Sequence, residues 1–566
     1  MVLDATLKAD YSPGSNKSGD MACADWRFLL PQLSVGVVVS IGIPSPSAIR
    51  ILSQFAREVH VLSSKMEQSQ AEDLRRFGNV YASTELAGEL PADGIDLLLI
   101  ADLQELGRAG SPVTIDKLLS SLTEAGAIYF GGHRAPLRAA LSKSAAFGRR
   151  FDAGSGTSSF WLTKQFGEVR TAVPLGRRRI SSFFFRTALH GKTRKKRLLS
   201  HIGRLASNLG LIEKLIRERA TIIAVGQDAC LRDAPPRYLR EVASQSGTDL
   251  SQFDFGFSAR GLYDSNKVIF FLFEKTEGEL QIVAKATRVA SFNVRLEQEW
   301  SALKQVETLK LAPAGTYPKP LFFGSQGGLA ILGQAAMKGD PFRIATTTRA
   351  DCPVVADAID WITQLGVNSA DTSHASSASV SDALLRLFDT FINIYDFPAE
   401  HTDYLRRQIV SISESEHGFP VVFGHGDAGV WNVTVESDGR SQFLDWEAAD
   451  PRGMPLWDLF YFINSFSNWV SRKRTGSMDS IANFRSNLLQ RGPFNDLLVS
   501  ATRQYCDSVG LHESLVAPMF YTCWMHRALR QATWAEVLQE GHFARLLRLC
   551  IEERRSPGLA RLFGEH

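Results

Sequence analysis

One stretch limits what this chain can fold into: a run from Phe423 to Val433, followed by a second run from Phe443 to Glu447. In the first run an apolar lead-in enters a turn, and a β-like segment comes after the turn. The pair Asp438-Gly439 is a turn signal between that segment and the next apolar strand. The pattern predicts two short strands in a hairpin, which brings the start of the first strand close to the end of the second.

Three polar side chains fall at that end of the hairpin, namely Asp427, Asn432 and Asp445. The first carboxylate can accept a proton from a hydroxyl group. The asparagine oxygen and the second carboxylate can hold Mg²⁺, a hard cation that prefers oxygen ligands and substrate phosphates. The spacing D-x-x-x-x-N, with a metal-binding aspartate after a following hairpin, is that of a kinase catalytic loop.

These residues resemble the aminoglycoside phosphotransferase and choline kinase family, through His425-Gly-Asp427, Asn432 and Leu444-Asp-Trp-Glu447. That family has a protein-kinase-like fold and phosphorylates small molecules. The resemblance implies that Asp427 is the catalytic base and that Asn432 and Asp445 are the metal ligands. It also implies that His425, the residue two positions before the base, braces the loop.

Two further segments carry the same resemblance, which covers roughly residues 253 to 535. Pro455-Leu-Trp-Asp458 matches the place where the family's aspartate supports the catalytic loop from the start of a helix. Leu329-Ala-Ile-Leu332 resembles the hinge that reads adenine through its backbone.

A lysine precedes this region in a setting typical of nucleotide-binding kinases. Three antiparallel strand candidates form a meander at Phe253 to Ser258, Val268 to Phe273 and Leu280 to Ala286. Lys285 lies in Val283-Ala-Lys-Ala286 on the third strand. Its carboxylate partner is expected on the following helix, where Glu297 and Glu299 are both candidates, and the resemblance favours Glu299.

After the hinge the chain reads as mainly helical, apart from a flexible insertion predicted at Ser369 to Ser379. In the family such late helices shape the acceptor pocket. The late helices here carry Trp524, Met525, His526, Arg527, Arg530 and Trp534. Packed aromatic side chains with surface arginines also explain this set. Its mixed charges argue against a polyamine antibiotic as the acceptor and leave a sugar or an alcohol open.

The N-terminal half alternates strands with helices, which predicts a doubly wound α/β domain with a parallel sheet. Its order resembles a class I methyltransferase, a family that binds S-adenosylmethionine at a Gly-rich turn. Here the turn after the first strand holds Gly42, but Pro44 and Pro46 stand where further glycines would let a ligand approach. Asp102 follows the third strand, where an aspartate often caps a helix. We interpret this half as a methyltransferase-like scaffold that has lost the cofactor.

A basic segment spans 177–219, with Arg177-Arg-Arg179, then Lys192-Thr-Arg-Lys-Lys-Arg197 and an amphipathic run from Leu198 to Ile216. Two readings are open. A peripheral contact with an anionic membrane or an acidic partner through 177–216 is one. The other, which we prefer, is a solvated charged face over an apolar stripe packed on the domain.

Composition sets the remaining limits, with 44% hydrophobic and 22% charged residues, as in ordinary globular proteins. The formal charge of +3 gives no indication of nucleic-acid binding. Six scattered cysteines without metal-ligand spacing fit a reducing compartment. No run is apolar enough to span a bilayer, and the first 25 residues have no apolar signal core. We therefore expect a cytoplasmic protein.

Together the patterns predict an α/β, doubly wound N-terminal domain and an α+β, protein-kinase-like C-terminal domain with a small β-rich lobe and a large helical lobe. The predicted segments are a flexible leader (1–25), the first domain (26–227), a linker (228–252), and the kinase-like domain (253–566) with lobes at 253–340 and 341–566. We expect the kinase-like domain to fold without the first one.

The resemblance implies an ATP- and Mg²⁺-dependent kinase that transfers the γ-phosphate to a hydroxyl of a sugar, an amino alcohol or a related metabolite. Lys285, oriented by Glu299, would bind the nucleotide phosphates, and GTP stays open as the donor. Two alternatives are a non-catalytic ATP-binding scaffold and a bifunctional methyltransferase-kinase. The scaffold is disfavoured because none of the catalytic positions is lost.

Overall fold

The computed structural model divides the chain into two compact units. The sheet unit runs to Leu296 and includes Leu321–Ala336, and the helical unit combines Glu297–Pro320 with Met337–His566. The structure describes residues 22–83, 94–108, 112–142, 144–150, 157–165, 168–188, 194–211, 218–225, 234–259, 267–371, 376–532 and 541–564.

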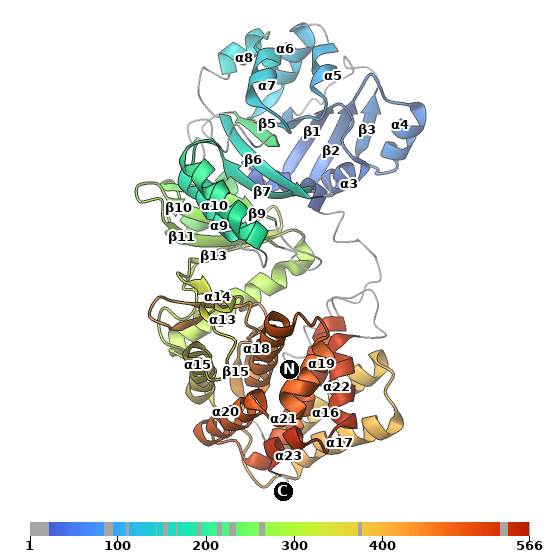
Figure 1. The fold of residues 1–566 in the computed structure, drawn as a ribbon. Coiled ribbons are helices and arrows are strands. Elements are labelled where there is room, and N and C mark those ends of the chain that lie inside the picture. The colour runs from blue at the N-terminus through green and yellow to red at the C-terminus, as the bar shows by residue number, and fades with distance from the viewer. Residues whose placement is uncertain are drawn as a thin grey trace. The chain divides into compact units, whose positions relative to one another are not determined.

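As far as the structure describes the sheet unit, one sheet of thirteen strands runs through it in the order β12-β13-β11-β10-β9-β7-β6-β8-β5-β4-β1-β2-β3 (Figure 1). Its parallel strands are β1 (Val35–Ile41), β2 (Ala56–Leu62), β3 (Val80–Ser83), β4 (Ile95–Ile100) and β5 (Leu122–Phe130). Helices alternate with them: α3 (Pro46–Phe55), α4 (Gln68–Arg75), α5 (Leu103–Arg108), α6 (Pro112–Ser120), α7 (Arg134–Leu141) and α8 (Ala145–Arg150). β1 is buried on both faces, because Val38 packs in one hydrophobic cluster and Val37 and Val39 in another. This arrangement agrees with the predicted doubly wound pattern.

The rest of the sheet is antiparallel. Its strands are β6 (Thr157–Gln165), β7 (Glu168–Pro174), β8 (Arg219–Ala224), β9 (Phe253–Ser258), β10 (Lys267–Glu274), β11 (Leu280–Thr287), β12 (Pro320–Gln326) and β13 (Leu329–Ala335). The predicted meander is confirmed as β9, β10 and β11. β7 pairs with β9 at Thr171↔Ser258 and Ala172↔Phe257, so the sheet continues across the predicted domain boundary.

Part of the predicted linker is a helix with a buried face. Residues 237–245 form α12 (Arg237–Gln245), and its Tyr238 and Leu239 lie in the same hydrophobic cluster as Phe28. The hydroxyl of Tyr238 donates to the backbone oxygen of Phe28 at 2.8 Å. Residues 226–233 of the linker region lie outside the described residues. The boundary predicted at 228–252 therefore lies inside the sheet unit.

The last residues of the flexible leader predicted at 1–25 are helical in the structure. Residues 1–21 lie outside the described residues. Residues from 22 on form η1 (Ala22–Leu29), where Asp25 is buried. Its carboxylate accepts two hydrogen bonds from the guanidinium of Arg288, at 3.0 and 2.8 Å. This ion pair, and not the polar character of the leader, determines the position of Asp25.

The helical unit is built mainly from α13 (Asn293–Leu309), α15 (Pro353–Ser369), α16 (Ser377–Ile394), α17 (Ala399–Ser413), α18 (Trp457–Thr475), α20 (Pro493–Val509), α21 (Val516–Ala532), α22 (His542–Glu552) and α23 (Pro557–Phe563). Smaller helical segments are α14 (Phe342–Ala345), α19 (Ser480–Phe484), η4 (Arg485–Leu489) and η5 (Glu513–Leu515). The described residues of the insertion predicted at 369–379 belong to or directly border regular structure: Ser369 ends α15, Asp371 bridges to Val421, and Ser377 begins α16. Residues 372–375 lie outside the described residues. Among the helices in the described part of the chain, none is long and apolar enough to cross a membrane.

Candidate active site

Four short strands of the helical unit hold the stretch that the sequence singled out. β15 (Val422–Gly424) pairs with β18 (Asp450–Gly453), and β16 (Val433–Val435) pairs with β17 (Ser441–Phe443). β14 (Asp340–Pro341) pairs with the outer side of β16. The backbone N–H of Leu444 donates to the oxygen of Asn432 at 2.8 Å, one step beyond the paired strands. The predicted hairpin is confirmed, and Asn432 and Asp445 lie at the same end of it.

The loop between β15 and β16 turns at Gly426, whose φ is +75°. A Cβ added there would overlap the carbonyl oxygen of Ala448. Only glycine fits this position, because it tolerates positive φ and has no side chain to clash.

His425 is fully buried behind the loop. Its Nδ1 accepts the backbone N–H of Asp427 at 3.2 Å, and its Nε2 lies 3.0 Å from the oxygen of Leu444. An accepting Nδ1 leaves the proton on Nε2, where it is donated to Leu444. Burial lowers the pKa of His425 despite the neighbouring carboxylates, which favours this neutral form. His425 therefore positions the loop, in agreement with its predicted bracing role.

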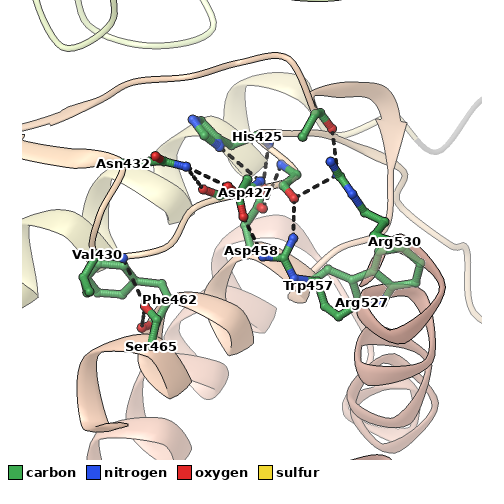
Figure 2. Close-up of polar contacts among 12 residues, drawn as sticks. His425, Asp427, Val430, Asn432, Trp457, Asp458, Phe462, Ser465, Arg527 and Arg530 are labelled. Atoms are coloured by element: carbon green, nitrogen blue, oxygen red, sulfur yellow. Dashed lines mark hydrogen bonds and ion pairs between the residues drawn. The ribbon is translucent and has the colours of Figure 1, made fainter. Parts of the chain in front are cut away.

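Asp458, near the start of α18, holds the same loop from below, as Figure 2 shows. Its two carboxylate oxygens accept the backbone N–H groups of His425 at 2.6 Å and Gly426 at 2.9 Å. Burial raises the pKa of Asp458, and the two backbone hydrogen bonds oppose that rise. The supporting role that the resemblance implied for this residue is consistent with these contacts.

Asp427 is held from two sides. Oδ1 accepts from Nη2 of Arg527 at 2.7 Å, and Oδ2 accepts from Nδ2 of Asn432 at 2.7 Å (Figure 2). Burial would raise the pKa of Asp427, but the charges of Arg527 and Arg530 and the hydrogen bond from Arg527 outweigh it. The pKa of Asp427 is therefore below its ordinary value. Asp427 is thus an ionised carboxylate at neutral pH.

One of the two explanations left open for the late helices, packed aromatic side chains with surface arginines, is wrong for Arg527, which is 7% exposed. Arg527 also donates to the oxygen of Gly426 at 2.7 Å, and its guanidinium lies 3.1 Å from the ring centre of Tyr461. Arg530 donates to the oxygen of Gly426 at 3.2 Å. A spacing of three residues puts both on one face of α21, which is the sequence signal that was available.

The two metal ligands predicted from the sequence have different surroundings: Asn432 binds Asp427, and Asp445 lies among carboxylates. Nδ2 of Asn432 gives its hydrogen bonds to Asp427, so its side-chain oxygen is the atom suited to a cation. Asp445 lies with Glu299 and Glu447 in a cluster whose ligand oxygens are all within 4.8 Å of one another. Carboxylates this close repel one another, and a positive charge near them offsets the repulsion. The oxygen donors fit a hard divalent cation such as Mg²⁺.

This cluster changes two expectations. Glu299 was assigned to Lys285 alone, and the structure places it beside Asp445. Glu447 was quoted in the motif without a role, although it follows Asp445 at the spacing of one intervening residue. Asp445 has φ of +65°, an uncommon backbone state for a residue other than glycine.

Lys285 is buried on β11 of the sheet unit, opposite Leu332 of β13 in the register. Leu332 belongs to the segment that resembles the adenine-reading hinge. Glu299 lies on α13 in the helical unit. The ion pair between Lys285 and Glu299 stays a prediction.

A comparison with known families matches residues 271–490 to the model of the phosphotransferase enzyme family. The C-terminal part of the chain is phosphotransferase-like. The matched residues include all six predicted site positions from Lys285 to Asp445, which confirms the resemblance stated from the motifs. A search of curated protein sequences found no match.

Solved structures with similarity to the chain include both kinases and methyltransferases. The aminoglycoside phosphotransferase APH(3'')-Id from Streptomyces rimosus has 14% identity over 50% of this chain and 93% of its own, with a TM-score of 0.31. The ethanolamine kinase of Plasmodium vivax has 12% identity over 56% of this chain and 82% of its own, with a TM-score of 0.30. The bifunctional kinase-methyltransferase WbdD has 11% identity over 95% of this chain and 87% of its own, with a TM-score of 0.23. Structural likeness of this degree does not by itself indicate a function.

Proposed function

We propose that the chain is an ATP-dependent phosphotransferase that requires Mg²⁺ and transfers the γ-phosphate to a hydroxyl group of a small molecule. The observation that carries the proposal is the ionised carboxylate of Asp427, fixed between Asn432 and Arg527. The family match at 271–490 supports the same reaction class.

Asp427 would accept the proton of the acceptor hydroxyl. Each of its oxygens spends one lone pair on Asn432 or Arg527 and keeps another for the hydroxyl. Arg527 and Arg530 would place positive charge beside the point where the hydroxyl meets the phosphoryl group, which stabilises charge that develops during transfer. The side-chain oxygen of Asn432 and the cluster of Asp445, Glu299 and Glu447 are the groups that would hold Mg²⁺. Bound there, Mg²⁺ would neutralise charge on the nucleotide phosphates.

A residue of the catalytic loop indicates which kind of acceptor could bind. Trp431, next to Asn432, is 50% exposed, and its ring packs edge-on against Tyr461 at 5.7 Å. An exposed indole face suits the apolar side of a ring such as a sugar. The cationic guanidinium of Arg527 lies over the same Tyr461 ring and disfavours a polycationic acceptor at this point. We therefore favour a neutral or anionic hydroxyl compound.

Contacts at the carboxyl ends of β1 and β4 support the inference that the N-terminal half is a scaffold without S-adenosylmethionine. At the ends of β1 and β4, a Cβ on Gly42 would lie 2.7 Å from Cβ of Asp102, so the turn is packed against its neighbour. Lys65 binds Asp102 at 2.8 Å and lies 3.8 Å from the buried Glu105. The polar groups at this edge thus satisfy one another. Heat released when S-adenosylmethionine is titrated into the protein would contradict the inference.

The test of the kinase proposal is Asp427→Ala, compared with Lys285→Ala. ATP affinity by calorimetry and phosphate transfer to acceptors found in a metabolite screen are measured for both. Asp427→Ala should keep ATP affinity and lose transfer, because Asp427 faces the hydroxyl, whereas Lys285→Ala should weaken ATP binding itself. Asp438→Ala, which removes an exposed carboxylate from the hairpin turn, is the matched control. Full transfer activity in Asp427→Ala would rule out the proposed base.

A further inference from the structure

The basic segment contains a helix that is packed in an unusual way. α10 (Arg194–Asn208) lies beside α9 (Arg178–Ala188) on the sheet unit (Figure 1). The residues that α10 turns inward are small. Ala206 joins a cluster with Ile180 and Phe184, and a Cβ added to Gly203 would overlap the ring of Phe185.

Three large apolar side chains, two near the end of α10 and one directly after it, point to solvent instead. Ile202, Leu205 and Leu209 are 52%, 62% and 60% exposed. At 100° per residue these positions lie within one stripe about 60° wide along the helix. A helix that packs on its domain ordinarily does the reverse, with large apolar residues inside. For these three residues the structure contradicts the reading we preferred from the sequence, in which the apolar stripe from Leu198 to Ile216 packs on the domain. The side chains of Leu198 and of residues 212–217 lie outside the described part of the chain.

The charge around the stripe has one sign. Ten Lys and Arg residues lie between 177 and 204, and the sequence has no Asp or Glu between Glu168 and Glu213. The first turn of α10 is Arg194-Lys-Lys-Arg197. The whole chain carries only +3, so this segment concentrates positive charge that the rest of the chain offsets.

We propose that α10 docks on the surface of an anionic phospholipid bilayer, with Ile202, Leu205 and Leu209 inserted among the acyl chains. A narrow apolar stripe flanked by lysine and arginine is the form of an interfacial helix. The basic residues would bind the anionic headgroups, an attraction that salt screens. A bilayer fits a protruding ridge of apolar side chains without a complementary groove, whereas a folded acidic partner would have to supply one.

The experiment is co-sedimentation of the full chain with vesicles of phosphatidylcholine alone or mixed with phosphatidylglycerol. Binding to the mixed vesicles should be about tenfold stronger than to the neutral ones and should weaken in high salt. The double variant Leu205→Glu/Leu209→Glu should lose that binding. Leu309→Glu/Met478→Glu is the matched control, since Leu309 and Met478 are 63% and 70% exposed elsewhere on the chain. Circular dichroism verifies that each variant is folded.

Three results would overturn the proposal. One is equal or absent binding to both kinds of vesicle. Another is binding that survives Leu205→Glu/Leu209→Glu, which would mean charge attraction without insertion. The third is self-association of the wild type in sedimentation velocity that the double variant abolishes without any vesicle binding, which would make the stripe a contact between copies of the chain.

Discussion

At the scale of single residues, the ionisation of Asp427 depends on a guanidinium 100 positions away in the sequence. Two arginine charges act on Asp427 and hold its pKa below the ordinary value. A carboxylate with a low pKa stays deprotonated, and so able to accept a proton, at neutral and mildly acidic pH. The cost of burial for this carboxylate is offset by Arg527 and Arg530 together.

Arg527→Gln should therefore shift the acid limb of the pH profile of kcat/KM to higher pH. Removal of one cation raises the pKa of Asp427, so at a given acidic pH a larger fraction of the base is protonated and inactive. Arg548→Gln removes the same charge from an exposed position on α22 and should leave the limb in place. An unchanged profile in Arg527→Gln would show that Asp427 is not the titrating base.

Asp445→Asn tests the carboxylate cluster with a readout independent of turnover. Without divalent cations the variant should melt close to the temperature of the wild type, because the substitution keeps nearly the same side-chain volume while it removes one carboxylate from the cluster. Excess Mg²⁺ should raise the melting temperature of the wild type and have little effect on the variant. Asp438→Asn is the control. An equal Mg²⁺ response in both proteins would mean that the cation binds elsewhere.

At the scale of elements, the hairpin was predictable because its information is local. Alternating apolar residues and the Asp438-Gly439 turn specify β16 and β17, and the motif spacing then places Asn432 and Asp445. The spacing of Arg527 and Arg530 showed that they share a helix face, but their contact with Asp427 was not predictable, because a long-range ion pair leaves no periodic trace in the sequence. The confirmed prediction is thus the local one, a hairpin with Asn432 and Asp445 at the same end.

Gly426→Ala should destabilise the protein by about 3 kcal/mol, the sum of a left-handed backbone penalty and an overlap with the oxygen of Ala448. Gly439→Ala in the hairpin turn has the first penalty alone, since its φ is +93° and no atom lies within 4 Å of the added Cβ. Its expected cost is about 1 kcal/mol. Chemical unfolding measures both, and equal costs would mean that the loop relaxes around the new methyl group.

At the scale of the whole molecule, sequence patterns identified most strands of the sheet but not their continuity. Each of β1, β4, β9 and β10 is legible as an apolar run. The pairing of β7 with β9 cannot be recognised in the sequence, because it depends on backbone N–H and C=O groups that nearly every residue possesses. The ion pair between Asp25 of η1 and Arg288 was not predictable either, because a single aspartate in a polar segment forms no recognisable sequence pattern.

A fragment that starts at Phe253 should accordingly fail to unfold cooperatively, contrary to the expectation from the sequence alone. It lacks Asp25, the partner of the buried Arg288, and it lacks the buried face of α12. Calorimetry of the fragment alone and mixed with the separately produced residues 1–252 makes the comparison. A sharp transition in the isolated fragment would restore the predicted boundary.

In the intact chain, Asp25→Ala should cost about 3 kcal/mol or more, because it strands the buried charge of Arg288. Arg27 is also buried next to this pair, so a second guanidinium loses its counter-charge. Asp249→Ala removes an exposed aspartate near α12 and is the control. A loss below that of the control would mean that water replaces Asp25 at this site.

The contact between Arg527 and Asp427 also joins two parts of the chain that are synthesised at different times. The chain is made from its amino end, so the loop around Asp427 leaves the ribosome before the helix that fixes it has been synthesised. A nascent or prematurely stopped chain that ends between Asp458 and Arg527 holds every motif residue and lacks the guanidinium that binds Asp427. The charge that lowers the pKa of Asp427 therefore arrives only when α21 has been translated.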